Sequence, residues 1–300
     1  MSIHIGSFST GLSSALTVER VLKRHGQCII VLMDVLIEDD DNYRFSQEMR
    51  ARWAKHPGAT FVTLTEGRTP YEVAEQQKII PNQKLAPCTF RLKIDMFVSW
   101  MKGVEAGTSE HTTNDGHTLP VAYDGSGLIV HIDYDYTEVE RCKSTRKNYE
   151  AYGWQVDFPL LWRPYELRPY EEVSRSDWGI DPPRMYGMGY SHANCGGMCV
   201  KQGRADWTRT LINFPARFAW AEAWEKKMRQ HPKRAAFTLL RDQSEGRVRP
   251  YSLTRLREEY EADQGPQLSF LDQMSPCIHC GIGDMLISTD DVILIVEESD

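Results

Sequence analysis

Apolar positions near the N-terminus alternate between two spacings, one typical of strands and the other typical of amphipathic helices. Residues 28–33 form a continuous apolar run, Cys-Ile-Ile-Val-Leu-Met, as expected for a strand buried on both faces. Residues 3–8 and 59–64 are further strand candidates, while residues 11–25 and 42–55 carry apolar side chains at helical spacing. The order strand–helix–strand–helix–strand predicts a twisted parallel sheet with right-handed crossovers and flanking helices, which is an α/β fold.

The pattern of the remaining chain divides it into two regions. Residues 127–133 predict a fourth strand and residues 138–152 a charged helix, whereas residues 103–127, rich in Gly, Thr, Asn, His and Asp, predict an excursion loop. We therefore expect an α/β domain over residues 1–160 and a mostly helical, cysteine-bearing region over residues 161–300 that packs on it. Further candidates are helices at residues 89–102 and 216–230 and a last strand at residues 292–296.

Composition and charge are those of an ordinary globular protein. The 300 residues are 41% hydrophobic and 26% charged, enough for a core without disulfide staples. The formal net charge of -7 gives no global attraction to nucleic acid and leaves a local basic patch open. The N-terminus lacks a basic stretch followed by an apolar run, so we expect no signal peptide, no membrane partner and a cytoplasmic location. In that reducing compartment the seven cysteines are expected as metal ligands, reactive thiols or core residues.

Four of the cysteines form two close pairs, Cys195 with Cys199 and Cys277 with Cys280. Each pair places two thiolates on one tight turn, where neighbouring glycines leave the backbone free to wrap around sulfur. Two pairs give four sulfur ligands, the number that tetrahedral zinc or a cubane iron–sulfur cluster requires. The spacing therefore predicts a four-cysteine metal site and leaves zinc and iron–sulfur open.

Cys88 is a fifth cysteine with two interpretations. It stands just before a predicted helix with Arg91 and Lys93 close by, and a helix N-terminus and nearby cations lower the pKa of a thiol. Cys88 is therefore a candidate nucleophile or a rival metal ligand. Cys28, inside a buried strand, and Cys142, on a charged helix, are expected to pack in the core.

A turn rich in small hydroxyl residues lies between the first strand and the first helix, with the sequence Ser-Phe-Ser-Thr-Gly-Leu-Ser-Ser over residues 7–14. Backbone N–H groups and the helix dipole can hold an anion at such a turn, and serine hydroxyls add donors. A serine N-cap for the helix explains the same residues without a ligand. The candidate phosphate-binding residues are Ser7, Ser9, Thr10, Gly11, Ser13 and Ser14.

Charged and aromatic groups beyond this turn also allow two interpretations each. Asp34 ends the second strand, where parallel sheets bind ligands, and the acidic run at residues 38–41 would hold magnesium with a nucleotide or begin the next helix as an N-cap. Five basic residues either form an anion site or make surface salt bridges: Arg44, Arg68, Arg91, Lys93 and Arg141. Four aromatic residues either stack on nucleic-acid bases or pack in the core: Trp154, Trp162, Tyr165 and Tyr170.

Several of these segments together resemble the PAPS reductase and N-type ATP pyrophosphatase superfamily. Most of these segments are similar in residue type and order to motifs of the superfamily. The last is similar to a motif of PAPS reductase-like proteins from phages and mobile elements. The segments are residues 7–14 (phosphate loop), 68–70 with 87–93 (basic motif), 133–141 (acidic strand–helix segment) and 194–201, Asn-Cys-Gly-Gly-Met-Cys-Val-Lys (phage-type motif).

The resemblance runs from about residue 2 to 284 and implies a Rossmann-like fold of the PP-loop type, with residues 1–160 as the nucleotide-binding domain. It implies an adenine nucleotide, ATP or PAPS, with magnesium, and it favours a 4Fe–4S cluster over zinc at the cysteines. The implied activity is sulfonucleotide reduction or ATP-dependent sulfur transfer to nucleic acid. The candidate catalytic residues are Cys88, Arg91 and Lys93, and Asp34, Arg68 and Asp133 join the phosphate loop as nucleotide-binding candidates.

The sequence departs from the family pattern at the phosphate loop. Thr10 stands where many members have a second glycine, and Leu12 and Ser13 stand where they have a basic residue and an aspartate. The C-terminal Glu-Cys-Gly-x-His nucleophile of sulfonucleotide reductases has no counterpart in the sequence. A second hypothesis is therefore a catalytically degenerate component of a phage or defence system, which binds nucleotide, nucleic acid or a protein partner and has a structural metal site.

Overall fold

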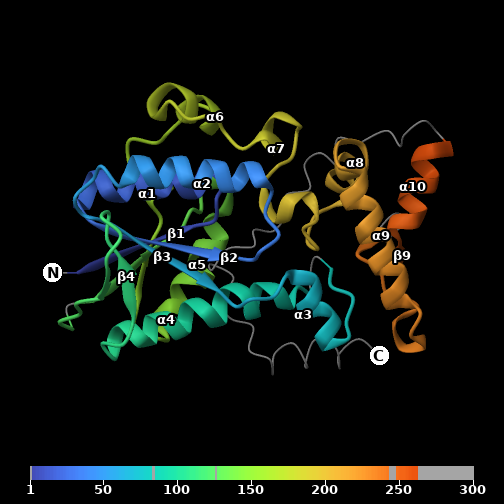
Figure 1. The fold of residues 1–300 in the computed structure, drawn as a ribbon, viewed down its shortest axis with the longest axis horizontal. Coiled ribbons are helices and arrows are strands. Elements are labelled where there is room, and N and C mark those ends of the chain that lie inside the picture. Colours follow the sequence, from blue (N-terminus) through green and yellow to red (C-terminus); the bar gives the residue numbers. More distant parts are fainter. Residues whose placement is uncertain (1, 83–84, 126, 243–247, 263–300) are drawn as a thin grey trace.

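A seven-stranded sheet forms the centre of the protein in a computed structural model that describes residues 2–82, 85–125, 127–242 and 248–262 (Figure 1). Its strands are β1 (Ile3–Phe8), β2 (Cys28–Asp34), β3 (Ala59–Thr65), β4 (Glu110–Thr112), β5 (Thr118–Pro120), β6 (Leu128–His131) and β7 (Gln155–Asp157). They lie in the order β5-β4-β3-β2-β1-β6-β7. Strands β3, β2, β1, β6 and β7 run parallel to one another. Strand β4 is antiparallel to β3, and β5 is antiparallel to β4. The predicted α/β fold with a mostly parallel sheet is therefore confirmed.

Helices cover both faces of this sheet because its central strands are apolar on both faces. Successive side chains of a strand point to opposite faces, so Cys28 and Ile30 of β2 join one core while Ile29 and Val31 join the other. Figure 1 shows α1 and α2 on one face and α4 on the other. The helices of this part are α1 (Leu12–His25), α2 (Asp40–Trp53), α3 (Pro70–Gln77), α4 (Asp95–Glu105) and α5 (Val139–Glu150), and the π-helical turn η1 (Thr89–Ile94) leads into α4.

Gly6 lets α1 approach the sheet closely. A Cβ atom at this position would lie 2.9 Å from the Sγ of Cys28 and 3.1 Å from the Cγ2 of Val18. The first distance is shorter than Cβ atoms adopt and the second is tight, so a glycine fits best in the strand beneath the helix. The contact also places Cys28 in the core, as predicted.

The excursion loop predicted for residues 103–127 is wrong in part, because it contains the hairpin of β4 and β5. This hairpin extends the sheet beyond β3, where Phe61 is paired with Thr112. Each of its strands has only three residues, and all three residues of β5 are solvent-exposed. Such short, exposed strands have no alternation of apolar and polar residues, which is the signal that reveals a strand in a sequence.

Residues 161–300 were predicted to be mostly helical; of this region, the described residues beyond 187 are mostly helical and form a separate core with α3 and η1. The predicted helix at residues 216–230 corresponds to α9. The elements are η5 (Asn194–Gly197), α8 (Arg204–Asn213), α9 (Pro215–Arg229), η6 (Pro232–Arg234), α10 (Leu253–Ala262) and the hairpin of β8 (Leu240–Asp242) and β9 (Arg249–Tyr251). The predicted strand at residues 292–296 and the pair Cys277 and Cys280 lie outside the described residues.

The segment between β7 and η5 runs back over α1 and α2 (Figure 1). Val173 and Trp178 of this segment share a core with α1 and α2. Its elements are η3 (Pro159–Leu161), α6 (Tyr170–Val173), η4 (Ser174–Trp178) and α7 (Arg184–Gly187), and η2 (Tyr136–Glu138) precedes α5. Within the described ranges, no helix combines the length and the apolar character needed to cross a membrane.

Candidate metal centre and phosphate loop

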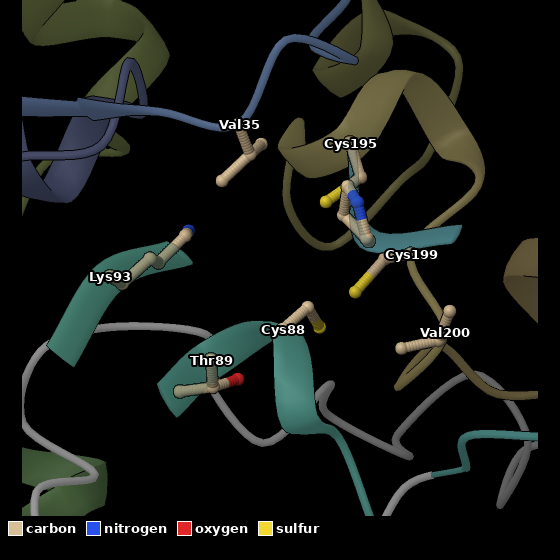
Figure 2. A pocket seen from close by; sticks show the side chains of 8 residues that line it. Val35, Cys88, Thr89, Lys93, Cys195, Cys199 and Val200 are labelled. Atoms are coloured by element: carbon tan, nitrogen blue, oxygen red, sulfur yellow. The ribbon is translucent and has the colours of Figure 1, made fainter. Parts of the chain in front are cut away.

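Three cysteines from distant parts of the chain meet at one cavity. Cys88 directly precedes η1, Cys195 lies in η5 and Cys199 follows it, and all three side chains are buried. Figure 2 shows their sulfur atoms pointing toward the same space. The other residues that line the cavity are Val35, Pro70, Thr89, Lys93 and Val200.

The turn that carries Cys195 and Cys199 has an unusual backbone. Cys195, Gly196 and Gly197 have φ values of 54°, 58° and 78°, so three successive residues adopt the left-handed region. A Cβ at Gly196 would lie 2.9 Å from the carbonyl oxygen of Ile37, which follows β2. The two glycines therefore permit both the turn and its close approach to the loop after β2. A cysteine in the left-handed region is strained, and such strain is typical of residues held in place for a function.

Two ionisable groups lie beside the cysteines, the half-buried Glu38 and the buried Lys93. The backbone N–H of Cys195 donates to the Oε2 of Glu38 at 2.5 Å, which fixes the start of the cysteine turn. Burial raises the pKa of Glu38 to about 7, and the nearby ammonium of Lys93 opposes that shift. The side chain of Lys93 is itself buried and faces the cavity (Figure 2). The cavity therefore combines three thiols with a cation at its wall.

Cys88 differs from a typical thiolate nucleophile. Burial and, after it, the neighbouring Cys199 raise its pKa to about 11, and Lys93 opposes both effects. The direction is opposite to the one expected from a helix N-terminus with nearby cations, because desolvation outweighs them. Arg91 contributes little here, since it pairs with Asp95 at 2.9 Å in a separate surface hollow. Of the two interpretations of Cys88, its position beside two further thiols favours the ligand.

Cys142 and Asp39 occupy the positions that the sequence predicts for a core residue and a helix N-cap. Cys142 is buried in the core beneath α5, as predicted. Asp39 is the N-cap of α2 and accepts a hydrogen bond from the N–H of Asp41 at 2.9 Å, which confirms the N-cap interpretation. Asp39 also accepts from Arg184 and Arg217, so this acidic residue is already neutralised by two guanidinium groups.

The phosphate-loop candidate is held by hydrogen bonds among its own residues. The Oγ of Ser14 accepts from the N–H of Ser9 at 3.1 Å and donates to the carbonyl oxygen of Gly11 at 3.0 Å. Thr10 has a φ of 62°, and its hydroxyl accepts from Asn42 at 3.1 Å. The N-cap of α1 is Gly11, and no side chain caps the helix. The serine N-cap interpretation is therefore wrong, because Ser14 bonds within the loop instead.

Tyr186 of α7 closes the loop from outside. The N–H of Leu12, the first residue of α1, donates to the Tyr186 hydroxyl at 3.3 Å. Burial raises the pKa of Tyr186 to about 12, so the hydroxyl stays protonated at neutral pH and can donate its own hydrogen to an acceptor. Sequence reasoning missed this residue, because a single tyrosine in a four-residue helix between prolines and glycines has no periodic signal.

The other nucleotide-binding candidates are distributed around the carboxyl ends of β1, β2 and β6. Ser7 is buried within β1. Asp34 accepts from the N–H of Leu36 at 2.8 Å and from the hydroxyl of Tyr43 at 2.7 Å. Asp133 follows β6 and is close enough to Tyr186 to raise the pKa of its hydroxyl, after the larger effects of burial and of Glu171. Ser13 lies in the first turn of α1.

The predicted anion site is not assembled from its five basic residues. Lys93 faces the cysteine cavity, whereas Arg68 and Arg91 line the surface hollow with Glu66 and Asp95. Arg44 and Arg141 lie on α2 and α5, on opposite faces of the sheet, and pair with Asp41 and Glu138. The four arginines therefore form salt bridges, as the alternative interpretation predicted.

The aromatic set is mainly part of the core. Trp154 is buried and its indole N–H donates to Glu105 at 2.8 Å. Trp162 and Tyr170 pack against the core beneath α1, while Tyr165 is half exposed. Core packing, the second interpretation of this set, is therefore confirmed for three of the four residues.

No protein-family model matches this chain, and no curated protein or solved structure matches it either. The three converging cysteines and the loop between β1 and α1 are therefore the structural features from which a function can be proposed.

Proposed function

We propose that this is a PAPS reductase-like protein that holds a 4Fe–4S cluster, binds an adenine nucleotide and acts in sulfur chemistry. The ligands would be Cys88, Cys195 and Cys199, with Cys277 or Cys280 as the fourth. The observation that carries the proposal is the convergence of three buried thiols from separate segments on one cavity. This ligand set retains the pair Cys195 and Cys199 of the sequence prediction, adds the unpaired Cys88 and uses one cysteine of the second pair.

The chemistry of the donors fits an iron–sulfur cluster or zinc, because thiolates bind both. A bound cubane cluster would supply one-electron or sulfur-carrying chemistry. The protein residues would set its surroundings: Lys93 offsets the negative charge of several thiolates, Glu38 holds the turn at Cys195, and apolar residues such as Val35 and Val200 exclude water.

One side chain, that of Asn42, connects the proposed nucleotide site to the proposed cluster site. The amide of Asn42 donates both to Thr10 of the loop at 3.1 Å and to the carbonyl oxygen of Ala193 at 2.7 Å. Ala193 stands two residues before Cys195, so the loop and the cysteine turn are tied to the same buried amide. This connection supports a reaction in which nucleotide and cluster act together, as in sulfonucleotide reduction or ATP-dependent sulfur transfer to nucleic acid.

A catalytically degenerate binding protein with a structural zinc is the second candidate. It is favoured by the loop, where Ser14 bonds internally and Tyr186 occupies the N–H of Leu12. A loop whose donors are engaged in this way, without the family's charged residues, is less suited to activating pyrophosphate.

Metal analysis of anaerobically purified protein distinguishes the two candidates. We expect a brown protein with about four iron atoms per chain, and an electron paramagnetic resonance signal after reduction. Cys88→Ser and Cys195→Ser should lose the iron, whereas Cys142→Ser, a buried cysteine away from the cavity, should retain it. Cys277→Ser and Cys280→Ser identify the fourth ligand. A colourless protein that contains zinc in place of iron would refute the cluster and favour the second candidate.

Nucleotide binding needs its own test, because the cluster and the loop are separate claims. Equilibrium binding of ATP and PAPS should be weakened by Ser9→Ala and Ser14→Ala, and unchanged by Ser144→Ala, an exposed serine on α5. Failure of the wild-type protein to bind either nucleotide would refute the assignment of the loop.

A further inference from the structure

Three histidines gather on the α1 side of the sheet, away from the cysteine cavity. His4 belongs to β1, His131 is the last residue of β6 and His25 is the last residue of α1. One ring nitrogen from each lies within 4.8 Å of the other two, and the Nδ1 of His4 is 2.9 Å from the Nε2 of His131. Their side of the sheet follows from Gly6, which faces α1 and stands two residues after His4.

These imidazoles occupy a layer that apolar side chains would fill at lower cost. His131 is fully buried, and its Nδ1 has no hydrogen-bond partner among the described residues. His4 is also buried, and the ring of Trp162 lies edge-on to both His25 and His131, with centroids 5.7 Å and 5.8 Å away. Burying an unpaired polar nitrogen costs free energy, so His131 in this layer indicates binding rather than packing.

The surrounding charges are nearly balanced. The Asp157 carboxylate acts on His4 and His25 as a nearby negative charge, and it is fixed by hydrogen bonds from the N–H of Phe158 at 2.8 Å and from the Trp162 indole at 3.1 Å. The Arg24 guanidinium is the opposing cation near His25 and lies over the Trp162 ring. A fixed carboxylate beside neutral imidazoles offsets part of the charge of a bound dication.

We propose that His4, His25 and His131 bind a divalent transition-metal ion of the zinc and cobalt class. Imidazole nitrogens are preferred ligands of such ions, and three of them leave one position open for water. That position would lie on the side of His25, the only one of the three that is exposed. The rings of His4 and His25 are stacked with centroids 3.8 Å apart, and a shared ion must lie near both ring planes. Binding therefore requires the His25 ring to turn out of the stack, which an exposed side chain at a helix end can do.

Cobalt titration of the chelator-treated, reduced full-length protein tests this site separately from the cysteines. Thiolate ligands give Co²⁺ an intense near-ultraviolet charge-transfer band that imidazole ligands lack. We expect the wild-type protein to bind a Co²⁺ ion that shows this band, at the cysteines, and one further Co²⁺ ion that does not show it. His25→Ala should weaken binding of the extra ion roughly tenfold or more, because it removes a ligand. His117→Ala, an exposed histidine outside the cluster, should leave it unchanged.

A second variant and a spectroscopic measurement test the same histidine site independently. His4→Gln should also lose the extra ion, and bound Co²⁺ should broaden the proton resonances of the His25 ring in the wild-type protein. If His25→Ala binds the same number of Co²⁺ ions with the same affinity, or if each ion bound by the wild type shows the thiolate band, the histidine site does not exist.

Discussion

The N–H of Leu12 donates a hydrogen bond to the hydroxyl of Tyr186, 174 residues later in the chain and 3.3 Å away. Leu12 begins α1, so this N–H is one of the donors that a helix presents to an anion at its N-terminus. A Cβ at the preceding Gly11 would lie 3.2 Å from the same hydroxyl, which shows how closely α7 covers the loop. Tyr186 therefore competes with a phosphate group for this donor.

Tyr186→Phe removes the competing acceptor. We expect the free energy of unfolding to fall by about 1 kcal/mol, since one hydrogen bond is lost. If the loop binds phosphate, the affinity for ATP or PAPS should rise by roughly fivefold, because the Leu12 N–H no longer has to leave another partner. Chemical denaturation and isothermal titration calorimetry measure the two effects. Tyr136→Phe, on an exposed tyrosine, is the control. A loss of affinity in Tyr186→Phe would mean that the hydroxyl contacts the nucleotide itself.

Asp39 joins α2 to two distant segments through its buried carboxylate. Burial alone would raise its pKa, but hydrogen bonds from Arg184 and Arg217 outweigh that effect and hold the pKa below its usual range. The carboxylate therefore stabilises the fold above the pKa it has in the unfolded chain, about 3.9, and this contribution is lost as the pH falls through the lower folded pKa.

Asp39→Asn should lower the free energy of unfolding by about 2 kcal/mol at neutral pH, because two charge-assisted hydrogen bonds are weakened. The difference from the wild type should shrink as the pH falls below about 4, where the carboxylate begins to be protonated in the unfolded wild-type chain, and should be lost once the pH has fallen through the lower folded pKa. Urea denaturation at a series of pH values measures this dependence. The exposed neighbour provides the control, Asp40→Asn, and an equal, pH-independent loss in both variants would contradict the role of the charge.

The charge of Lys93 can be removed from the cavity wall without removing a proposed cysteine ligand of the cluster. Its ammonium lowers the pKa values of both Cys88 and Glu38, so it stands close to the proposed cluster. Lys93→Met keeps most of the side-chain volume and removes the charge. A bound cluster should retain its iron and have a lower reduction potential, because a nearby cation stabilises the reduced form. A redox titration followed by electron paramagnetic resonance measures the shift. Arg91→Met, whose guanidinium pairs with Asp95 outside the cavity, should leave the potential unchanged, and an unchanged potential in Lys93→Met would place the cluster elsewhere.

The central strands could be predicted from the sequence because their apolar runs are long and uninterrupted. β1, β2 and β3 lie within one residue of their predicted ends. The hairpin of β4 and β5 could not be predicted, since its three-residue strands are mostly exposed and have no apolar alternation.

The candidate site was only partly visible in the sequence, for a different reason. Spacing reveals ligands that share one turn, and it therefore identified Cys195 and Cys199 as a pair. Cys88 joins them only because the residue before η1 and the cysteine turn at η5 share one core, a contact between distant segments that no local pattern records. Tyr186 reaches Leu12 by the same kind of long-range contact.

Gly196 tests whether the backbone of the cysteine turn is required for the site. An alanine there would have to adopt a φ of 58°, and its Cβ would lie 2.9 Å from the carbonyl oxygen of Ile37. The left-handed conformation alone costs about 1–2 kcal/mol for a residue with a side chain, and the contact adds to this cost. We expect Gly196→Ala to lower the free energy of unfolding by about 2 kcal/mol or more and to reduce the bound metal, since the turn that aims Cys195 and Cys199 must shift. Gly187→Ala is the matched control, because a Cβ at that position meets no other atom. Full metal content in Gly196→Ala, measured by elemental analysis, would show that the site forms without this turn.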